Sequence, residues 1–192
     1  NRLRQKPHLN PEYALAKHGL NTREVLSGRE RTFSRFLYYR SFYANEKPTI
    51  LCEGKTDNIY IKSAINKLCS VYPRLAKVKT LTSAYQLLVS LFNYTERTRF
   101  LLQLYGGTSY LKDFIETYEQ HYAFYKAPKP THPVIIILDN DTGFNSIETF
   151  LKGNKGKQAV SFPAGLKDAP YRDADFIHVL HNLYIVLTPL GA

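Results

Sequence analysis

Several features that mark common classes of protein are missing from this sequence. It has two cysteines, Cys52 and Cys69, which are too few for a disulfide framework, and no Cys/His spacing predicts a zinc site. No apolar run reaches the ~18 residues of a membrane-spanning helix. The N-terminus is basic and polar, without the apolar core of a secretory signal. We therefore expect a cytoplasmic protein in which both cysteines are reduced core residues.

Methionine is also absent, and the chain begins at Asn1. We therefore expect this sequence to be a fragment of a longer chain. Its 192 residues are 44% hydrophobic, which is enough for one domain with a substantial core. The sequence contains no internal repeats and no low-complexity segment.

Positive charge is abundant and unevenly distributed. The formal net charge is +10, and residues 1–47 hold ten Lys/Arg against four acidic residues. We expect this basic stretch to be an arm or linker that precedes a domain over residues 48–192. A basic arm suits a polyanionic partner such as nucleic acid, because phosphate contacts supply affinity for any base sequence. Lysine and arginine that merely keep a surface solvated explain the same charge, so both interpretations stay open.

Within the arm, the stretch Arg29–Tyr43 predicts an amphipathic helix with an aromatic face and an arginine face. One interpretation is that its arginines and tyrosines grip a nucleic acid. The alternative is that the apolar face packs on the following domain while the arginines are solvated, and we favour this packing for the apolar residues. That face comprises Phe33, Phe36, Leu37 and Tyr39. The candidate nucleic-acid contacts are Arg29, Arg31, Arg35 and Arg40.

Beyond the arm, apolar runs alternate with helical patterns. We expect strands at residues 49–52, 100–105, 134–138, 159–162 and 183–187. We expect helices at residues 57–72, capped by Thr56, and at 82–94, 109–126, 142–151 and 173–181. The first of these helices should bury Ile59, Ile61, Ala64, Ile65 and Leu68. The alternation predicts a three-layer, Rossmann-like α/β fold with a parallel sheet flanked by helices.

Acidic residues follow two of the expected strands. Glu53 and Asp57 come after the first strand, and Asp139 and Asp141 come after the third. The carboxyl ends of parallel strands meet at one edge of the sheet, where sites form in open α/β folds. Mg²⁺ prefers hard oxygen ligands, and one or two such ions support phosphodiester hydrolysis. The sequence therefore predicts a Mg²⁺ site for phosphodiester chemistry, with Gly54 leaving room for a phosphate or metal near the backbone.

Together these motifs resemble the Toprim domain. The resemblance rests on Glu53-Gly54 with Asp57, on the Gly106-Gly107 turn and on Asp139-Asn140-Asp141, and it covers roughly residues 48–190. Topoisomerases, bacterial primases, recombination mediators and overcoming-lysogenization-defect nucleases share the Toprim fold. The whole stretch, including the lead-in FLYYRSFY, is most similar to the C-terminal Toprim region of retron reverse transcriptases.

The resemblance implies a role for each matching acid. Glu53 would be a metal ligand or a general acid/base, Asp139 and Asp141 would bind Mg²⁺ or Mn²⁺, and Asp57 would be a ligand or would orient one. Nuclease-type members add a basic residue and a further acid after the aspartate pair, and many relatives have another acid after the last strand, which would lie beyond the end of this sequence. The candidates for this basic residue and further acid are Lys155, Lys157, Lys167 and Asp168. The three lysines and Lys55 are also candidate nucleic-acid contacts.

The function that the resemblance implies is a Mg²⁺-dependent nuclease that cleaves RNA or DNA. It would be the effector portion of a retron reverse transcriptase fusion in antiphage defence, in a chain that also has RNA-directed DNA polymerase activity. The implied partners are the retron RNA/DNA hybrid and a cleavable RNA or DNA, and a homo-oligomer stays open. One alternative is a non-catalytic module that binds nucleic acid or a neighbouring protomer through residues 1–47. Another, phosphoryl transfer with Asp139 as nucleophile, is disfavoured because a glycine-rich phosphate loop is absent.

Two further pairs of polar residues are better explained without a site. Asp173 and Asp175 precede an expected helix, whose N-terminal dipole their charges would complement. His178 and His181 have no evident third ligand, so we expect an exposed or hydrogen-bonded pair.

Overall fold

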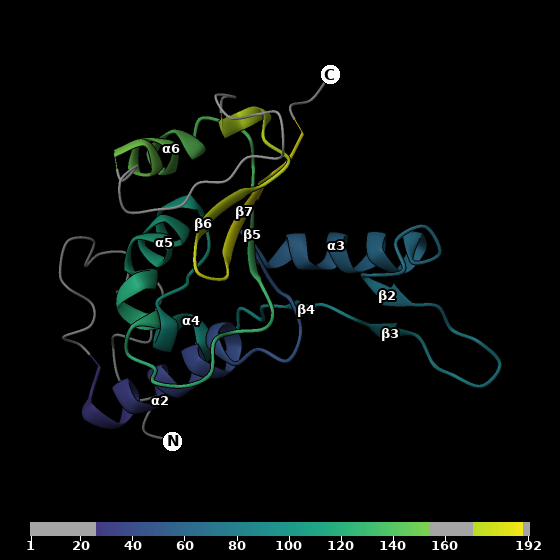
Figure 1. The fold of residues 1–192 in the computed structure, drawn as a ribbon, viewed down its shortest axis with the longest axis horizontal. Coiled ribbons are helices and arrows are strands. Elements are labelled where there is room, and N and C mark those ends of the chain that lie inside the picture. Colours follow the sequence, from purple (N-terminus) through teal and green to yellow (C-terminus); the bar gives the residue numbers. More distant parts are fainter. Residues whose placement is uncertain (1–25, 154–170, 190–192) are drawn as a thin grey trace.

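A five-stranded sheet forms the centre of the structure (Figure 1). The structure, a computed structural model, describes residues 26–153 and 171–189. The strands lie in the order β4-β1-β5-β7-β6, and all neighbours are parallel except β6, which is antiparallel to β7. The strands are β1 (Thr49–Cys52), β4 (Ser90–Leu91), β5 (Val134–Leu138), β6 (Ile177–Leu180) and β7 (Leu183–Leu187). The expected α/β fold with a mostly parallel sheet flanked by helices is therefore confirmed.

Helices cover both faces of this sheet, and Figure 1 shows α5 and α6 on one side and α3 on the other. The expected helices at residues 109–126 and 142–151 correspond to α5 and α6. No helix within the two described ranges is both long enough and apolar enough to cross a bilayer. The helical elements are α2 (Gly28–Tyr38), the π-helical turn η3 (Tyr39–Tyr43), α3 (Lys55–Leu68), α4 (Glu96–Leu102), α5 (Thr108–Tyr122), α6 (Phe144–Gly153) and the 3-10 turn η4 (Tyr171–Asp173).

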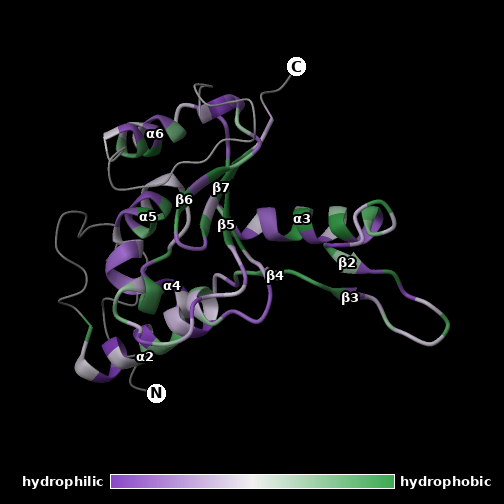
Figure 2. Cartoon of the chain, viewed as in Figure 1, coloured by the Kyte–Doolittle hydropathy of each residue, from purple (hydrophilic) through white to green (hydrophobic). Residues whose placement is uncertain are grey.

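Strand β5, at the centre of the sheet, is a continuous apolar sequence and is green in Figure 2, and its neighbour β1 is buried along its whole length. In β5 every second residue from Val134 to Leu138 is fully buried beneath α5 and α6, while Ile135 and Ile137 are half-buried on the α3 side. Cys52, the last residue of β1, lies beside Ile137. Both strands therefore end at the same edge of the sheet, and the acidic residues that follow them start from neighbouring positions.

The α2–η3 segment contributes to the main core. Phe42 is fully buried, and its ring contacts those of Tyr38 and Phe114, at centroid distances of 5.1 and 4.9 Å. The side-chain amide of Asn182, in the β6–β7 turn, donates to the carbonyl of Phe42 at 3.0 Å. Packing of this segment on the sheet domain is therefore observed, while the division of the chain between residues 47 and 48 stays a prediction.

The apolar face of α2 is only partly as expected. Leu37 is buried against α4, as expected. Phe33 and Phe36 are 41% and 51% exposed and stack on each other, so the packing predicted for them is wrong. The buried side of the helix includes Tyr38, which was not on the predicted face and lies in the main core.

The helix predicted over residues 82–94 is wrong, because this segment forms strands. Its first part is β3 (Gln86–Leu87), which pairs antiparallel with β2 (Ala76–Lys77). Its second part is β4, where the amides of Ser90 and Phe92 donate to the carbonyls of Pro48 and Ile50, each at 2.8 Å. The apolar spacing fits a helix, but pairing along the edge of β1 satisfies the backbone in an extended form instead.

Two further assignments are wrong for a similar reason. The strand predicted at 100–105 is absent: residues 100–102 are the end of α4, and 103–105 follow it without regular structure. This helix begins where the side chain of Thr95 accepts a hydrogen bond from the amide of Thr98 at 3.2 Å. The helix predicted at 173–181 contains β6 instead, in which Ile177 and Val179 alternate inward. In short apolar runs, the spacing of apolar residues does not distinguish the repeat of a helix from that of a strand. The strand predicted at 159–162 lies outside the described residues.

Helix α3 projects away from the rest of the molecule together with β2 and β3 (Figure 1). Its expected buried face is largely wrong: in the helix only Ile65 is buried, while Ile59 and Leu68 are 65% and 46% exposed. The first part of the helix packs on β1 and β5, whereas its outer part extends past the sheet, where the small β2–β3 pair lies beside it.

Candidate functional site

Glu53, the residue after β1, is held by the turn between α4 and α5. The amide of Gly107 donates to the carbonyl of Glu53 at 2.8 Å, and the hydroxyl of Thr108 donates to the Glu53 carboxylate at 2.6 Å. Gly106 has a φ of 96°, and a side chain there would meet the Glu53 carbonyl at 3.0 Å. Gly106 is therefore required by this close approach. The Gly107 amide fixes the backbone of Glu53, and the Thr108 hydroxyl fixes its side chain.

Asp57 lies in the first turn of α3 and caps that helix. Its carboxylate accepts a hydrogen bond from the amide of Gly54 at 2.7 Å. The N-cap is Gly54, so the prediction that Thr56 caps the helix is wrong. One Asp57 oxygen is thus occupied by a structural contact with the turn beside Glu53.

The acidic loop after β5 lies against the same turn. Asp139 is exposed, and the Asp141 carboxylate accepts from the amide of Gly143 at 2.7 Å. A side chain at Gly143 would meet the hydroxyl of Thr108 at 2.9 Å and the Asp141 carboxylate at 3.0 Å. The hydroxyl that binds Glu53 therefore lies beside the Asp141 loop, which brings residues from three separate segments to one place.

Electrostatics couple these four acids. Burial raises the pKa of the Glu53 carboxyl above its ordinary value, and the hydrogen bond from Thr108 partly opposes this shift. The negative charges of Asp139, Asp141 and Asp57 raise the pKa of Glu53 further. Ionised Glu53 is thus destabilised by its neighbours, and a cation placed among them would relieve the repulsion.

Arg172, in the η4 turn, is a residue that the sequence analysis missed. Its guanidinium donates to the Asn140 side chain at 2.7 Å, to the Asp141 carbonyl at 2.9 Å and to the Asn145 side chain at 2.6 Å. It also lies 3.6 Å from a Glu148 carboxylate oxygen. The planar fork thereby ties the Asp-Asn-Asp loop to α6. No sequence spacing marks this arginine, because its partners lie about thirty residues away.

Thr108 and Tyr94 were also missed. The hydroxyl of Tyr94 donates to the Cys52 carbonyl at 2.6 Å, at the end of β1. Thr108 had a usable signal, since it directly follows the Gly106-Gly107 turn. Tyr94 had none, because it lies in a segment whose secondary structure was assigned wrongly.

The predicted nucleic-acid contacts are placed only in part. On the arm all four arginines are exposed, and Arg35 lies over the ring of Phe124 at 4.2 Å. Lys55 is exposed in the first turn of α3, close in sequence to Glu53. The remaining candidates, Lys155, Lys157, Lys167 and Asp168, lie outside the described residues.

The histidine pair is hydrogen-bonded, as expected, although in a strand turn rather than on a helix. A ring nitrogen of His178 contacts the carbonyl of His181 at 2.8 Å, and His181 bonds the Glu119 carboxylate. His181 also stacks on Tyr122 at a centroid distance of 3.6 Å. These contacts explain both histidines structurally. Asp173 ends the η4 turn and Asp175 precedes β6, so the helix expected after them is absent.

The carboxylates share an edge without forming a complete ligand set. Among residues 26–153 and 171–189, no three His, Cys, Asp or Glu side chains are placed to hold one metal ion. Glu53, Asp139 and Asp141 nevertheless offer the oxygen donors that Mg²⁺ prefers, and their mutual repulsion favours a cation. The chemistry of these donors therefore suits a hard divalent ion.

Comparisons with known proteins add no assignment: no protein-family model matches the chain, and no solved structure matches it. The resemblance to Toprim domains therefore remains a prediction that rests on the motifs themselves.

We expect the substitution Glu53→Gln to stabilise the fold at neutral pH in the presence of EDTA. Because the folded-state pKa of Glu53 is raised, its protonated form stabilises the fold below the unfolded value of about 4.3, and this contribution is lost as the pH rises through the folded pKa. The neutral amide keeps the Thr108 contact and removes the repulsion. The Tm should rise by roughly 2–4 °C for each kcal/mol of relief at pH 8, and the gain should vanish at acidic pH.

The matched control for this measurement is Glu46→Gln, at an exposed glutamate outside the site. Its Tm should follow the wild type at every pH. A Glu53→Gln protein that is less stable than the wild type at pH 8 would show that the acids do not repel one another.

Proposed function

We propose that this chain carries a Toprim-like, Mg²⁺-dependent nuclease that hydrolyses phosphodiester bonds in RNA or DNA. The observation that supports the proposal best is the convergence on Thr108: its hydroxyl binds Glu53 and lies beside the Asp141 loop. Acids from the ends of two adjacent parallel strands thus share one edge of the sheet. In α/β folds this edge is where ligands bind.

In this proposal the residues have distinct tasks. Glu53, Asp139 and Asp141 would hold the ion, and Asp57 would keep the turn after β1 in place through its bond to Gly54. Mg²⁺ bound there would stabilise negative charge on a phosphate and activate a water molecule. Arg172 would keep the Asp-Asn-Asp loop in position. Burial raises the pKa of Glu53, which suits a carboxyl group that also accepts and returns a proton.

The wider setting follows from the resemblance alone. The domain would be the effector of a retron reverse transcriptase fusion that acts in antiphage defence.

The direct test of the nuclease is to incubate the chain with single-stranded and double-stranded RNA and DNA, with Mg²⁺ and with EDTA. We expect cleavage of at least one substrate in Mg²⁺ and none in EDTA. Cleavage that continues unchanged in EDTA would contradict the proposal.

A second candidate function is a non-catalytic module that binds nucleic acid. The observation that favours it is the absence of three converged acidic ligands in the described part of the chain, with Asp57 and Asp141 each bonded to a nearby backbone amide. Binding that is sensitive to salt but indifferent to Mg²⁺ and to the loss of Asp139, without cleavage, would support this candidate.

A further inference from the structure

A basic finger projects from the sheet next to the candidate site. The finger is defined by residues 55–93, which include α3, the β2–β3 pair and β4 (Figure 1). It holds six Lys/Arg and one acidic residue, Asp57, so its formal net charge is +5 of the chain's +10. Seven of the eleven large hydrophobic side chains that are exposed among the described residues also lie here, including Ile59 and Tyr60. Exposed apolar groups and excess positive charge thus occur on one projection.

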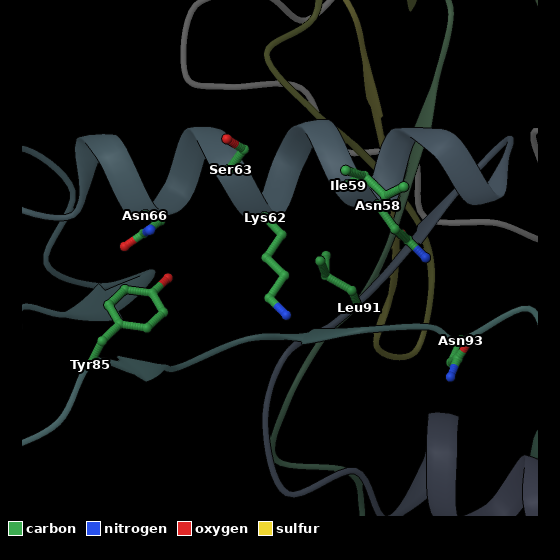
Figure 3. Close-up of a pocket in the computed structure, with 8 residues that line it drawn as sticks. All are labelled: Asn58, Ile59, Lys62, Ser63, Asn66, Tyr85, Leu91 and Asn93. Atoms are coloured by element: carbon green, nitrogen blue, oxygen red, sulfur yellow. The ribbon is translucent and has the colours of Figure 1, made fainter.

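A groove of about 640 Å³ runs along this finger, between α3 and the extended segment 85–93 (Figure 3). Asn58 and Asn93 line one end, and Asn66 and Tyr85 line the other. Figure 3 shows the side chain of Lys62 reaching from α3 across the gap. With a rise of about 1.5 Å per residue, the helix between Asn58 and Asn66 spans about 12 Å.

Two polar atoms in this groove are buried and unpaired within the described ranges. They are the Asn58 side-chain oxygen and the Tyr85 hydroxyl. The Asn58 nitrogen, in contrast, donates to the Phe92 carbonyl at 2.7 Å, which fixes the amide so that its oxygen is left for another group. Buried polar groups without partners cost free energy, so a ligand that displaces the side chains covering them and pairs with them gains affinity.

We propose that this groove binds a single strand of nucleic acid and leads it to the acidic edge. Of the described residues that line the groove only Lys62 is charged, which suits a phosphate, while Ile59 and Leu91 offer apolar surface to an unpaired base. A duplex keeps its bases stacked inside and cannot present them to such a groove. The inference rests on the proposed function in taking nucleic acid as the substrate, and adds its strandedness and its path.

One end of the groove lies next to the candidate site. Asn58 directly follows Asp57, whose carboxylate caps α3 beside Glu53. Asn93 lies just beyond β4, which runs parallel to β1, so it leaves the sheet at the same edge as Glu53. A nucleic-acid strand that lies along α3 therefore reaches the carboxylates at the N-terminal end of this helix.

The test measures binding of fluorescent 20-nucleotide single-stranded RNA and DNA by anisotropy, in EDTA, with the 192-residue chain. Lys62→Glu should raise the Kd at least about tenfold relative to the wild type, a loss of about 1.4 kcal/mol. Lys62→Ala should lower the slope of log affinity against log salt by about 0.7, the value for one phosphate contact on a single strand. The matched control is Lys129→Glu, at an exposed lysine outside the finger, and it should change the Kd less than twofold.

The outcomes separate this inference from the nuclease proposal. If Lys62→Glu loses binding while the wild type cleaves nothing, the groove stands and the nuclease fails. If the wild type cleaves but Lys62→Glu binds like Lys129→Glu, the groove is wrong and the nuclease stands. Equal affinity for a duplex of the same length would overturn the single-strand assignment. A wild type that binds no oligonucleotide but forms a dimer sensitive to Lys62→Glu would overturn the inference in favour of a second copy of the chain.

Discussion

The substitution Asp139→Ala should abolish Mg²⁺-dependent cleavage while leaving the protein folded. Loss of one ligand from a metal site should lower the rate at least about a thousandfold, or about 4 kcal/mol of transition-state stabilisation. Asp139 is exposed directly after β5, so removing its side chain should change the free energy of unfolding by less than about 0.5 kcal/mol. The measurement is the single-turnover cleavage rate in Mg²⁺, with the far-ultraviolet circular dichroism spectrum as a check of folding.

The matched control for Asp139 is Asp175→Ala. Like Asp139, Asp175 is an exposed aspartate. Unlike Asp139, it does not follow a parallel strand, because it lies before β6. Its loss should leave the cleavage rate within about twofold, or roughly 0.4 kcal/mol. If Asp139→Ala cleaves at the wild-type rate, the acidic edge is not the site, whatever substrate is cleaved.

The substitution Phe42→Ala should cause the largest loss of stability. Phe42 is fully buried, and its ring contacts those of Tyr38, Phe92 and Phe114. Removing such a ring from a packed core costs about 3–5 kcal/mol. Because the free energy of unfolding of a small domain is only about 5–15 kcal/mol, we expect a large drop in the urea midpoint, measured by circular dichroism.

Phe36→Ala serves as the control for Phe42→Ala. Phe36 lies on α2, six residues before Phe42, and is 51% exposed. Its free energy of unfolding should stay within about 0.5 kcal/mol of the wild type. Equal effects of the two substitutions would show that the α2–η3 segment does not belong to the core of the sheet domain.

The elements that sequence predicted best are those with one dominant signal. The five apolar residues of β5 have no competing helical interpretation. Helix α5 has an apolar stripe at helical spacing, and four residues of this stripe are buried. The segment that became β3 and β4 failed because its apolar residues also fit a helix. The extended form is decided by pairing with other segments: β3 pairs with β2, and β4 bonds to Pro48 and Ile50, which are distant in sequence and leave no local pattern.

The candidate site was predictable where the backbone determines it. Parallel strands in register place Glu53 and Asp139 at one edge, and this follows from the strands alone. The Thr108 hydroxyl and the Arg172 guanidinium reach the site through side-chain contacts across 55 and 32 residues, which spacing does not encode. The groove on the finger was missed for a related reason, since it exists only because α3 extends beyond the sheet.

The central claim, that the acidic edge binds a divalent ion, is tested most directly by titrating Mn²⁺ into the protein and following the free ion by electron paramagnetic resonance. The wild type should bind Mn²⁺, and Mg²⁺ should displace it. Asp139→Asn, which keeps the size of the side chain and removes its charge, should weaken binding at least about tenfold, or 1.4 kcal/mol, whereas Asp175→Asn should not. A wild type that binds no Mn²⁺, or an Asp139→Asn protein that binds as tightly as the wild type, would contradict the account.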